Sequence, residues 1–183
     1  MRISKEQAAE NRERVVETAS TLFRERGFDG VAVADLMRAA GFTHGGFYNH
    51  FPTKEALSAE ALTRAFEEMA RVRTRAVDLS EMLTGYLSKA ARRAPGKTCP
   101  AAALAGDAAR QPAPVRDAFA DGVEGMIESF AAQIEGPDGR ARAIALLARM
   151  AGGLMLSRAV PDDHLLADEI LKATLASCLA EVG

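Results

Sequence analysis

Apolar residues recur at three- and four-residue steps along most of this chain, which is the spacing of one face of an α-helix. No stretch of the sequence alternates with the period of two that is typical of strands, so we expect an all-α fold. Glycine and proline mark the breaks between the periodic segments. The pattern predicts about nine helices, over residues 6–26, 33–40, a short stretch after Thr43, 54–75, 79–90, 99–110, 115–134, 140–160 and 163–181.

The first predicted helix is amphipathic and ends at Gly27, a residue common just beyond helix ends. Arg2 and Lys5, ahead of this helix, belong either to a disordered chain end or to a basic arm that contacts a partner. The apolar face carries Val15, Val16, Ala19, Leu22 and Phe23. The opposite face, which we expect to be solvated, carries Arg12, Arg14, Glu17, Arg24 and Glu25.

Two short predicted helices lie on either side of Gly41. Gly41 favours the left-handed conformation that ends the helix over residues 33–40. Thr43 is placed to cap the next helix, and Phe42 can pack on Phe47 across its first turn. Two short helices joined by a tight turn that contains glycine form a helix-turn-helix, whose second helix normally lies in the major groove of DNA.

The stretch from Gly27-Phe28 through VADLMRAAGFTHGGFYNHF to PTKEAL resembles the DNA-binding domain of the TetR/AcrR family of transcriptional repressors. The likeness is dense over about residues 10–65. It implies a three-helix DNA-binding domain over residues 1–53, a connecting helix over 54–76, and a helical effector-binding and dimerisation domain over 77–183. The matching positions are Gly27, Ala39-Ala40-Gly41, Tyr48, Phe51 and Lys54.

The second short helix and its flanks hold the predicted DNA contacts. Gly45 and Gly46 disfavour a helix, so this segment is either a loose turn or a backbone that approaches the groove closely. His44, with Thr43 and Asn49, is left to read bases. The resemblance implies that Tyr48 and His50 bind phosphates, while Phe47 and Phe51 point to the core. The predicted contacts are Thr43, His44, Gly45, Gly46, Tyr48, Asn49, His50 and Lys54.

Lys54 is the predicted first residue of the long helix, which Thr53 caps. Helix N-termini bind anions through their free amide groups, and a lysine there adds a positive charge. We therefore expect Lys54 and the first-turn amides to hold a DNA phosphate.

The remaining chain is assigned mainly through the resemblance, which implies a homodimer that binds a pseudo-palindromic double-stranded DNA operator and releases it when a small effector binds. An apolar stripe on the last two helices can serve as monomer core or as subunit interface, and the resemblance favours the interface. The predicted effector pocket comprises Met82, Tyr86, Cys99, Phe119, Met126 and Phe130. The predicted dimer interface comprises Ile144, Leu147, Ala151, Leu154, Met155, Leu166, Ile170 and Ala173.

Composition changes this picture little. Of the 183 residues, 48% are hydrophobic and 26% are charged, as in a folded domain, and the net charge of −2 means that DNA must be attracted by a local patch. No apolar run approaches the roughly 18 residues of a membrane span, and the first residues lack a signal peptide's apolar region, so we expect a cytoplasmic protein. Cys99 and Cys178 match no zinc motif, and we expect no metal or cofactor.

Two alternatives stay open. Cys99 precedes Pro100 at a predicted helix start, where Lys97, Arg92 and Arg93 would favour a reactive thiolate and an electrophile- or redox-sensing repressor; the other possibility is an inert buried thiol. The second alternative is a helical-bundle small-molecule binding protein or enzyme without DNA binding. We assign no catalytic residue, because no histidine joins a nucleophile and no nucleotide-binding loop occurs.

Overall fold

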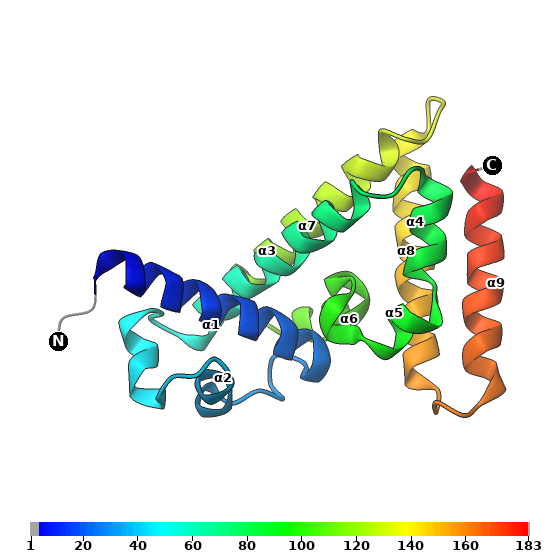
Figure 1. The fold of residues 1–183 in the computed structure, drawn as a ribbon. Helices are drawn as coiled ribbons and strands as arrows, with labels where there is room; N and C mark the ends of the chain where they lie inside the picture. The colour runs from blue at the N-terminus through cyan, green and yellow to red at the C-terminus, as the bar shows by residue number, and fades with distance from the viewer. Residues whose placement is uncertain (1–3, 183) are drawn as a thin grey trace.

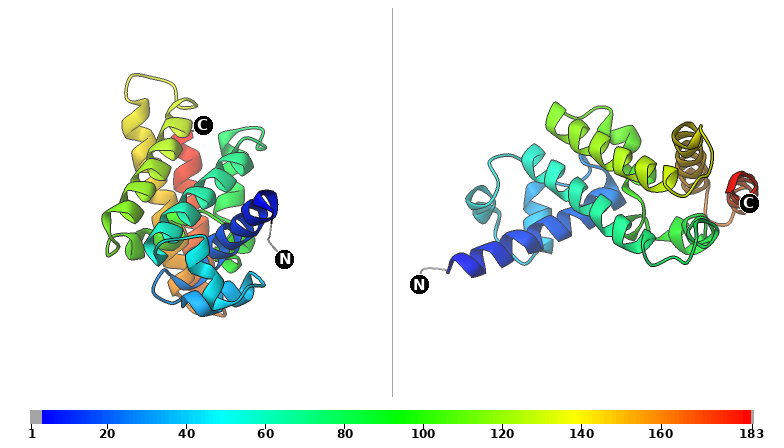
Figure 2. Two further views of the ribbon diagram at one scale, coloured as in Figure 1. Left: turned by 90° about the vertical axis from the view of Figure 1, so that its left-hand side faces the viewer. Right: turned by 90° about the horizontal axis from the view of Figure 1, so that it is seen from above.

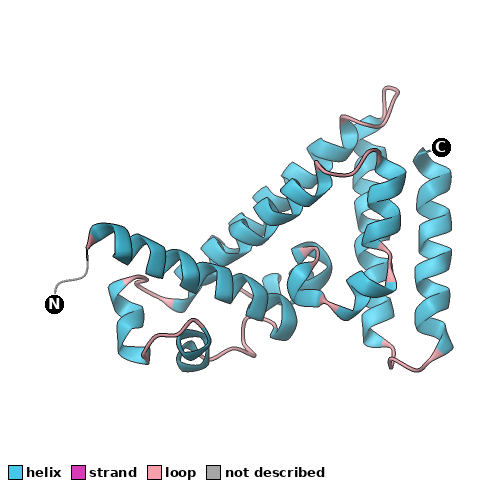
Figure 3. Ribbon diagram, viewed as in Figure 1, coloured by secondary structure: helices cyan, strands magenta, loops and turns pink. Residues whose placement is uncertain are grey.

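The computed structural model describes residues 4–182, which form nine α-helices and two short 3-10 helices joined by loops (Figure 3). The all-α prediction is confirmed for this part of the chain. Arg2 of the predicted arm lies outside the described residues, and Lys5 is the first residue of a helix. The elements are α1 (Lys5–Arg26), α2 (Val33–Ala39), η1 (His44–Asn49), α3 (Lys54–Arg73), α4 (Leu79–Tyr86), α5 (Lys89–Arg93), η2 (Pro95–Lys97), α6 (Pro100–Ala108), α7 (Ala113–Ala131), α8 (Gly139–Ala159) and α9 (Leu165–Val182).

The N-terminal helices and the last two helices lie at opposite ends of the molecule (Figure 1). Helices α8 and α9 run antiparallel at one end, and α1 and α2 lie at the other, as Figure 2 also shows from above. Between the two ends α3 and α7 run side by side. The predicted DNA-binding segment and the predicted dimer helices are therefore far apart, and α3 spans much of the distance between them.

The turn around Gly41 forms as the sequence predicts. Gly41 has a φ of +84°, in the left-handed region, and its N–H donates to the Arg38 carbonyl over 3.0 Å. The Phe42 N–H donates to the Met37 carbonyl over 2.8 Å. This pair of bonds is the Schellman arrangement that ends a helix and turns the chain sharply, and here it separates α2 from η1.

The predicted helix over residues 79–90 is wrong, because the chain breaks there into α4 and α5. The hydroxyl of Ser88 accepts a hydrogen bond from the Ala91 N–H over 3.0 Å, so Ser88 caps a new helix. Apolar spacing alone did not show this break, since a capping serine can also stand inside a helix.

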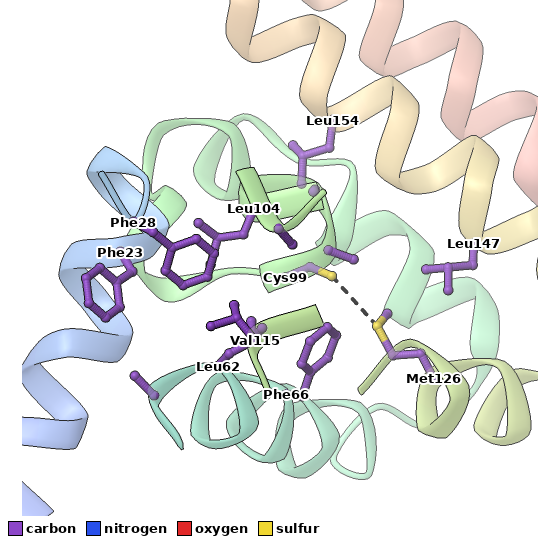
Figure 4. Packing of buried hydrophobic residues seen from close by; sticks show 14 of the residues in the cluster. Phe23, Phe28, Leu62, Phe66, Cys99, Leu104, Val115, Met126, Leu147 and Leu154 are labelled. Atoms are coloured by element: carbon purple, nitrogen blue, oxygen red, sulfur yellow. Dashed lines mark hydrogen bonds between the residues drawn. The ribbon is translucent and has the colours of Figure 1, made fainter. Parts of the chain in front are cut away.

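One hydrophobic core runs through the described residues. Figure 4 shows Phe23 and Phe28, from the N-terminal part, beside Leu104 of α6 and Val115 of α7, and all four belong to a single buried cluster. The N-terminal helices are thus packed firmly on the rest of the chain. Among the helices of residues 4–182, none combines the length and apolarity that a membrane crossing demands.

Candidate functional site

The second short helix of the helix-turn-helix is a 3-10 helix, η1, rather than an α-helix. The Gly46 N–H donates to the Thr43 carbonyl over 3.1 Å, which is the three-residue hydrogen bond of that geometry. Thr43 stands at the cap position, but the predicted side-chain cap is wrong, because the carbonyl takes the N–H that the hydroxyl would have received. The low helix propensity of Gly45 and Gly46 accounts for the weaker helix.

Two buried aromatic rings anchor η1 to the core and leave its polar residues outside. Phe47 and Phe51 are almost fully buried, with ring centroids 5.7 Å apart, as the resemblance implied. The intervening Tyr48 is 67% exposed. Of the other predicted DNA contacts on this segment, Gly46 and His50 are half-buried, and the exposed ones are Thr43, His44, Gly45 and Asn49.

The fold itself does not require glycine at either position of η1. A Cβ atom at Gly45 would meet no atom of the described residues within 4 Å, and at Gly46 the nearest atom would be Met37 Cε at 3.6 Å. Both distances leave room for a side chain. Packing within the chain therefore does not explain the two glycines, and their missing side chains open this surface to whatever approaches it from outside.

Lys54 begins α3, and its amine is held in place. Thr53 caps the helix as predicted, since its hydroxyl accepts the Ala56 N–H over 3.1 Å. Lys54 Nζ donates to the Phe28 carbonyl over 2.6 Å, tying α3 to the loop that follows α1. An ammonium group has three donors, so this bond positions the amine and leaves donors for a phosphate.

Arg24 of α1 is a buried connector, although the sequence pattern placed it on a solvated face. It is 4% exposed, and its guanidinium donates to Glu68 of α3 over 2.8 Å and to the Thr98 carbonyl over 3.2 Å. Arg12, expected on the same face, pairs with Glu60 of α3 and lies over the Phe51 ring at 4.6 Å. Helix α1 is thus linked through charged groups to α3 and to the segment before α6.

A cavity of about 390 Å³ lies between α3, α4 and the segment before α6. Four of the predicted pocket residues line it, namely Met82, Tyr86, Cys99 and Met126. Phe119 and Phe130 do not. The Phe119 ring packs edge-on against Phe66 of α3, with centroids 5.8 Å apart, and Phe130 is fully buried in the core.

Two polar side chains at or behind this cavity, those of Arg73 and Arg158, escaped the sequence analysis, whereas Tyr86 was among the predicted pocket residues. Within residues 4–182, Nε and Nη1 of Arg73, the hydroxyl of Tyr86 and Nη1 of Arg158 are buried and have no hydrogen-bond partner. Arg73 lines the cavity, and Arg158 lies behind it, donating to the hydroxyl of the lining residue Thr98 over 2.5 Å. The sequence could have indicated Arg73, because it follows Met69 by four residues and so lies on the apolar face of α3.

Burial perturbs the ionisation of these groups. It lowers the pKa of both the Arg73 and the Arg158 guanidinium, and it raises the pKa of Tyr86 well above its usual value, with Cys99 acting in the same sense. Tyr86 therefore keeps its proton and can donate it in a hydrogen bond. The two guanidinium groups stay charged, since arginine does not lose its proton in proteins.

The predicted basic environment of Cys99 is only partly present. Arg92, expected beside the thiol, donates instead to the Ser157 and Val160 carbonyls and pairs with Asp162. Cys99 is 2% exposed, and its sulfur lies 3.8 Å from the sulfur of Met126 (Figure 4). A reagent from solution reaches this thiol only through the cavity.

The predicted dimer residues differ in exposure. Leu147 and Leu154 are buried within the core of the single chain, with Leu154 0% exposed, so they offer a partner little surface. This part of the apolar stripe of α8 faces the chain's own helices. Ala151 and Ile170 are half-buried, and the exposed members are Ile144, Met155, Leu166 and Ala173, to which the structure adds Leu156 and Leu165.

No group of three or more His, Cys, Asp or Glu side chains converges to hold a metal ion in the described part of the chain.

The N-terminal segment matches a known family. Residues 15–61 match the model of the bacterial regulatory proteins of the tetR family. Over 60 residues the chain is 42% identical to the HTH-type transcriptional repressor DhaR of Mycobacterium sp. (strain GP1), covering 33% of this chain and 30% of that protein. It is 36% identical over 56 residues to the HTH-type transcriptional repressor KstR2 of Mycolicibacterium smegmatis, and this match covers 31% of this chain and 27% of that protein. The matched part thus spans under a third of these relatives.

Solved structures extend the likeness of the fold to the whole chain. The reduced form of NemR from E. coli superposes with a TM-score of 0.77 at 20% identity, covering 95% of this chain and 97% of that one. A TetR transcriptional regulator from Legionella pneumophila gives a TM-score of 0.77 at 17% identity and covers all of both chains. TetR-family regulators are DNA-binding proteins rather than enzymes. The helix-turn-helix segment of this chain thus belongs to the TetR/AcrR family of transcriptional regulators, and its fold is the one that solved TetR-family regulators share.

Proposed function

We propose that this protein is a homodimeric repressor that binds a pseudo-palindromic DNA operator through η1 and is released when a small molecule enters the cavity beside α3. Residues 1–53 would bind DNA, residues 54–76 connect, and residues 77–183 bind the effector and the second subunit. The observation that carries the proposal is η1 itself. Its polar residues are exposed above two buried phenylalanines, in a segment that matches a DNA-binding family.

The geometry of α3 supports a link between the two sites. Lys54 stands at one end of this helix, beside η1, while Met69, Val72 and Arg73 at its other end line the cavity. An effector that displaced the cavity end would tilt the helix on which the DNA-binding segment rests. In a dimer this would change the separation of the two η1 segments, which must match half-sites about 34–36 Å apart or a multiple of that distance.

The first prediction separates base reading from phosphate binding. Replacing His44 by Ala is expected to alter which operator sequences are preferred, because His44 is the largest exposed base-reading group on η1. Replacing Lys54 by Ala is expected to weaken binding to all sequences and to make the salt dependence shallower by about one unit. Fluorescence anisotropy with DNA from upstream of the protein's own coding region, at several salt concentrations, measures both effects.

Gly45→Ala serves as the test that η1 itself contacts DNA. The added methyl group fits the fold, so the melting temperature should stay the same or rise, while operator affinity should fall because the backbone can no longer approach closely. Full operator affinity in both Gly45→Ala and Lys54→Ala would refute the assignment of the interface to η1 and α3.

The second prediction concerns the dimer. Met155 is 47% exposed on α8 and Leu166 is similarly exposed on α9, so a charge at either site should not disturb the folded monomer. In a buried interface the same charge would be unpaired and costly. Met155→Glu combined with Leu166→Glu is expected to convert a dimer into a folded monomer and to weaken operator binding, as measured by light scattering and anisotropy.

Val77→Glu is the matched control, because Val77 is 89% exposed and belongs to the turn between α3 and α4 rather than to α8 or α9. It should leave the mass in solution unchanged. A wild-type protein that is monomeric at micromolar concentration, or a double variant that stays dimeric, would contradict the proposed interface.

A further inference from the structure

The cavity beside α3 presents buried hydrogen-bond donors that lack acceptors. Arg73 offers Nε and Nη1, and Tyr86 offers its hydroxyl, and within the described residues none of these atoms has a partner. Burying a charged donor without an acceptor is costly, and folded proteins seldom leave such groups unpaired without a functional reason. Two neighbouring elements, α3 and α4, supply these donors to one cavity.

The charge around the cavity is predominantly positive. Arg73 forms none of the ion pairs found within residues 4–182, and Arg158 behind the wall forms none either. The exposed lining residues Arg75 and Lys97 add two cations. The one carboxylate of the lining, on Glu81, already accepts the Val77 N–H over 2.6 Å. An anion therefore finds unpaired hydrogen-bond donors here, whereas a cation finds Glu81 as the one carboxylate of the lining.

Apart from Thr98, the rest of the lining is largely apolar. Met69, Val72, Ala76, Met82 and Met126 provide flexible or small side chains, and methionine adapts its shape to different ligands. A cavity of about 390 Å³ has the size of a small-molecule site. It is too large for a lone inorganic anion to fill.

We propose that this cavity binds a small amphipathic carboxylate, whose negative group is held by Arg73 and Tyr86 and whose apolar body lies among the methionines. Arg73 donates N–H groups of its charged guanidinium to the carboxylate, and such charge-assisted hydrogen bonds are stronger than neutral ones. Tyr86 donates its hydroxyl to the same group. This inference rests on the proposed effector response of the cavity and names the class of effector.

The test compares ligands that differ only in charge, using the full-length protein without DNA. The probes are octanoate, octanamide and octylamine, and in parallel indole-3-acetate, indole-3-acetamide and tryptamine, with acetate as the head group alone. Calorimetry and thermal shift are expected to show the carboxylate binding about 10- to 100-fold more tightly than the matched amide or amine, which is the usual effect of charged hydrogen bonds. Acetate should bind far more weakly than either carboxylate with an apolar body.

Variants connect this preference to the proposed donors. Arg73→Met should abolish the preference for the carboxylate and raise the melting temperature of the ligand-free protein by about 2–4 °C, because it removes a half-buried charge whose Nε and Nη1 are unpaired. Tyr86→Phe should weaken carboxylate binding about tenfold without reversing the preference. Arg71→Met, on the same helix but exposed and outside the cavity, should change neither property.

The outcomes distinguish this inference from the proposed function. Equal binding of the three charge states in both series, absence of binding, or an unchanged preference in Arg73→Met would overturn the carboxylate site, even if another molecule released the operator. Carboxylate binding that depends on Arg73 would support the site even if octanoate and indole-3-acetate left operator affinity unchanged, and only the effector-controlled repressor would then fail.

Discussion

Replacing Gly122 by Ala is expected to destabilise the fold by about 2–3 kcal/mol, in the range of overpacked cores. Gly122 lies on α7 where it meets α3, and a Cβ atom there would stand 2.1 Å from Cδ2 of the Phe66 ring. Phe66 is buried and held by Phe119, so its ring cannot move aside freely. Urea unfolding followed by circular dichroism should show an earlier midpoint, and operator affinity should fall because α3 carries the DNA-binding segment.

Gly125→Ala is the control from the same helix. A Cβ atom at Gly125 meets nothing within 4 Å among residues 4–182, so this change should stabilise the protein by up to about 1 kcal/mol through helix propensity. Equal midpoints for the two variants would mean that α3 and α7 do not approach each other this closely.

Replacing Arg24 by Met is expected to cost about 2–3 kcal/mol, somewhat less than the usual loss for breaking a fully buried ion pair. The expected cost is smaller because the side chain of Glu68 is 30% exposed, so water can partly solvate its carboxylate once Arg24 is removed. The Thr98 carbonyl also loses a donor. Chemical denaturation measures this loss.

The same variant should uncouple the two sites. Thr98 lines the cavity, and its carbonyl accepts a hydrogen bond from Arg24 of α1, so the Arg24 side chain joins the cavity to the N-terminal helices. Under the proposed function, Arg24→Met should still bind an effector but release DNA less on binding it. Arg26→Met, exposed in the last turn of α1, should leave both stability and release unchanged. A full response in Arg24→Met would show that the coupling runs elsewhere, with α3 as the alternative route.

Local pattern was sufficient for most helices and for the helix-turn-helix. The stop at Gly41 and the cap at Thr53 depend on neighbouring residues only, and both formed as predicted. The break at Ser88 was missed, because near neighbours permit either outcome there and packing decides. Predictions for the ligand site were weaker, since Phe119 and Phe130 follow the same helical spacing as true lining residues.

The sequence by itself determined the all-helical fold and the position of the helix-turn-helix, because these follow from short-range spacing and turn chemistry. The two phenylalanines that anchor this segment were indicated by its resemblance to a known family. Only the tertiary structure decided which apolar faces are covered, and so that Leu147 and Leu154 belong to the core while Met155 and Leu166 are exposed. The tertiary structure also decided that Arg24 forms an ion pair with Glu68, whereas Arg73 forms none within residues 4–182. Helical periodicity shows which residues share a face, whereas a buried charge gains or lacks a partner only through elements distant in sequence.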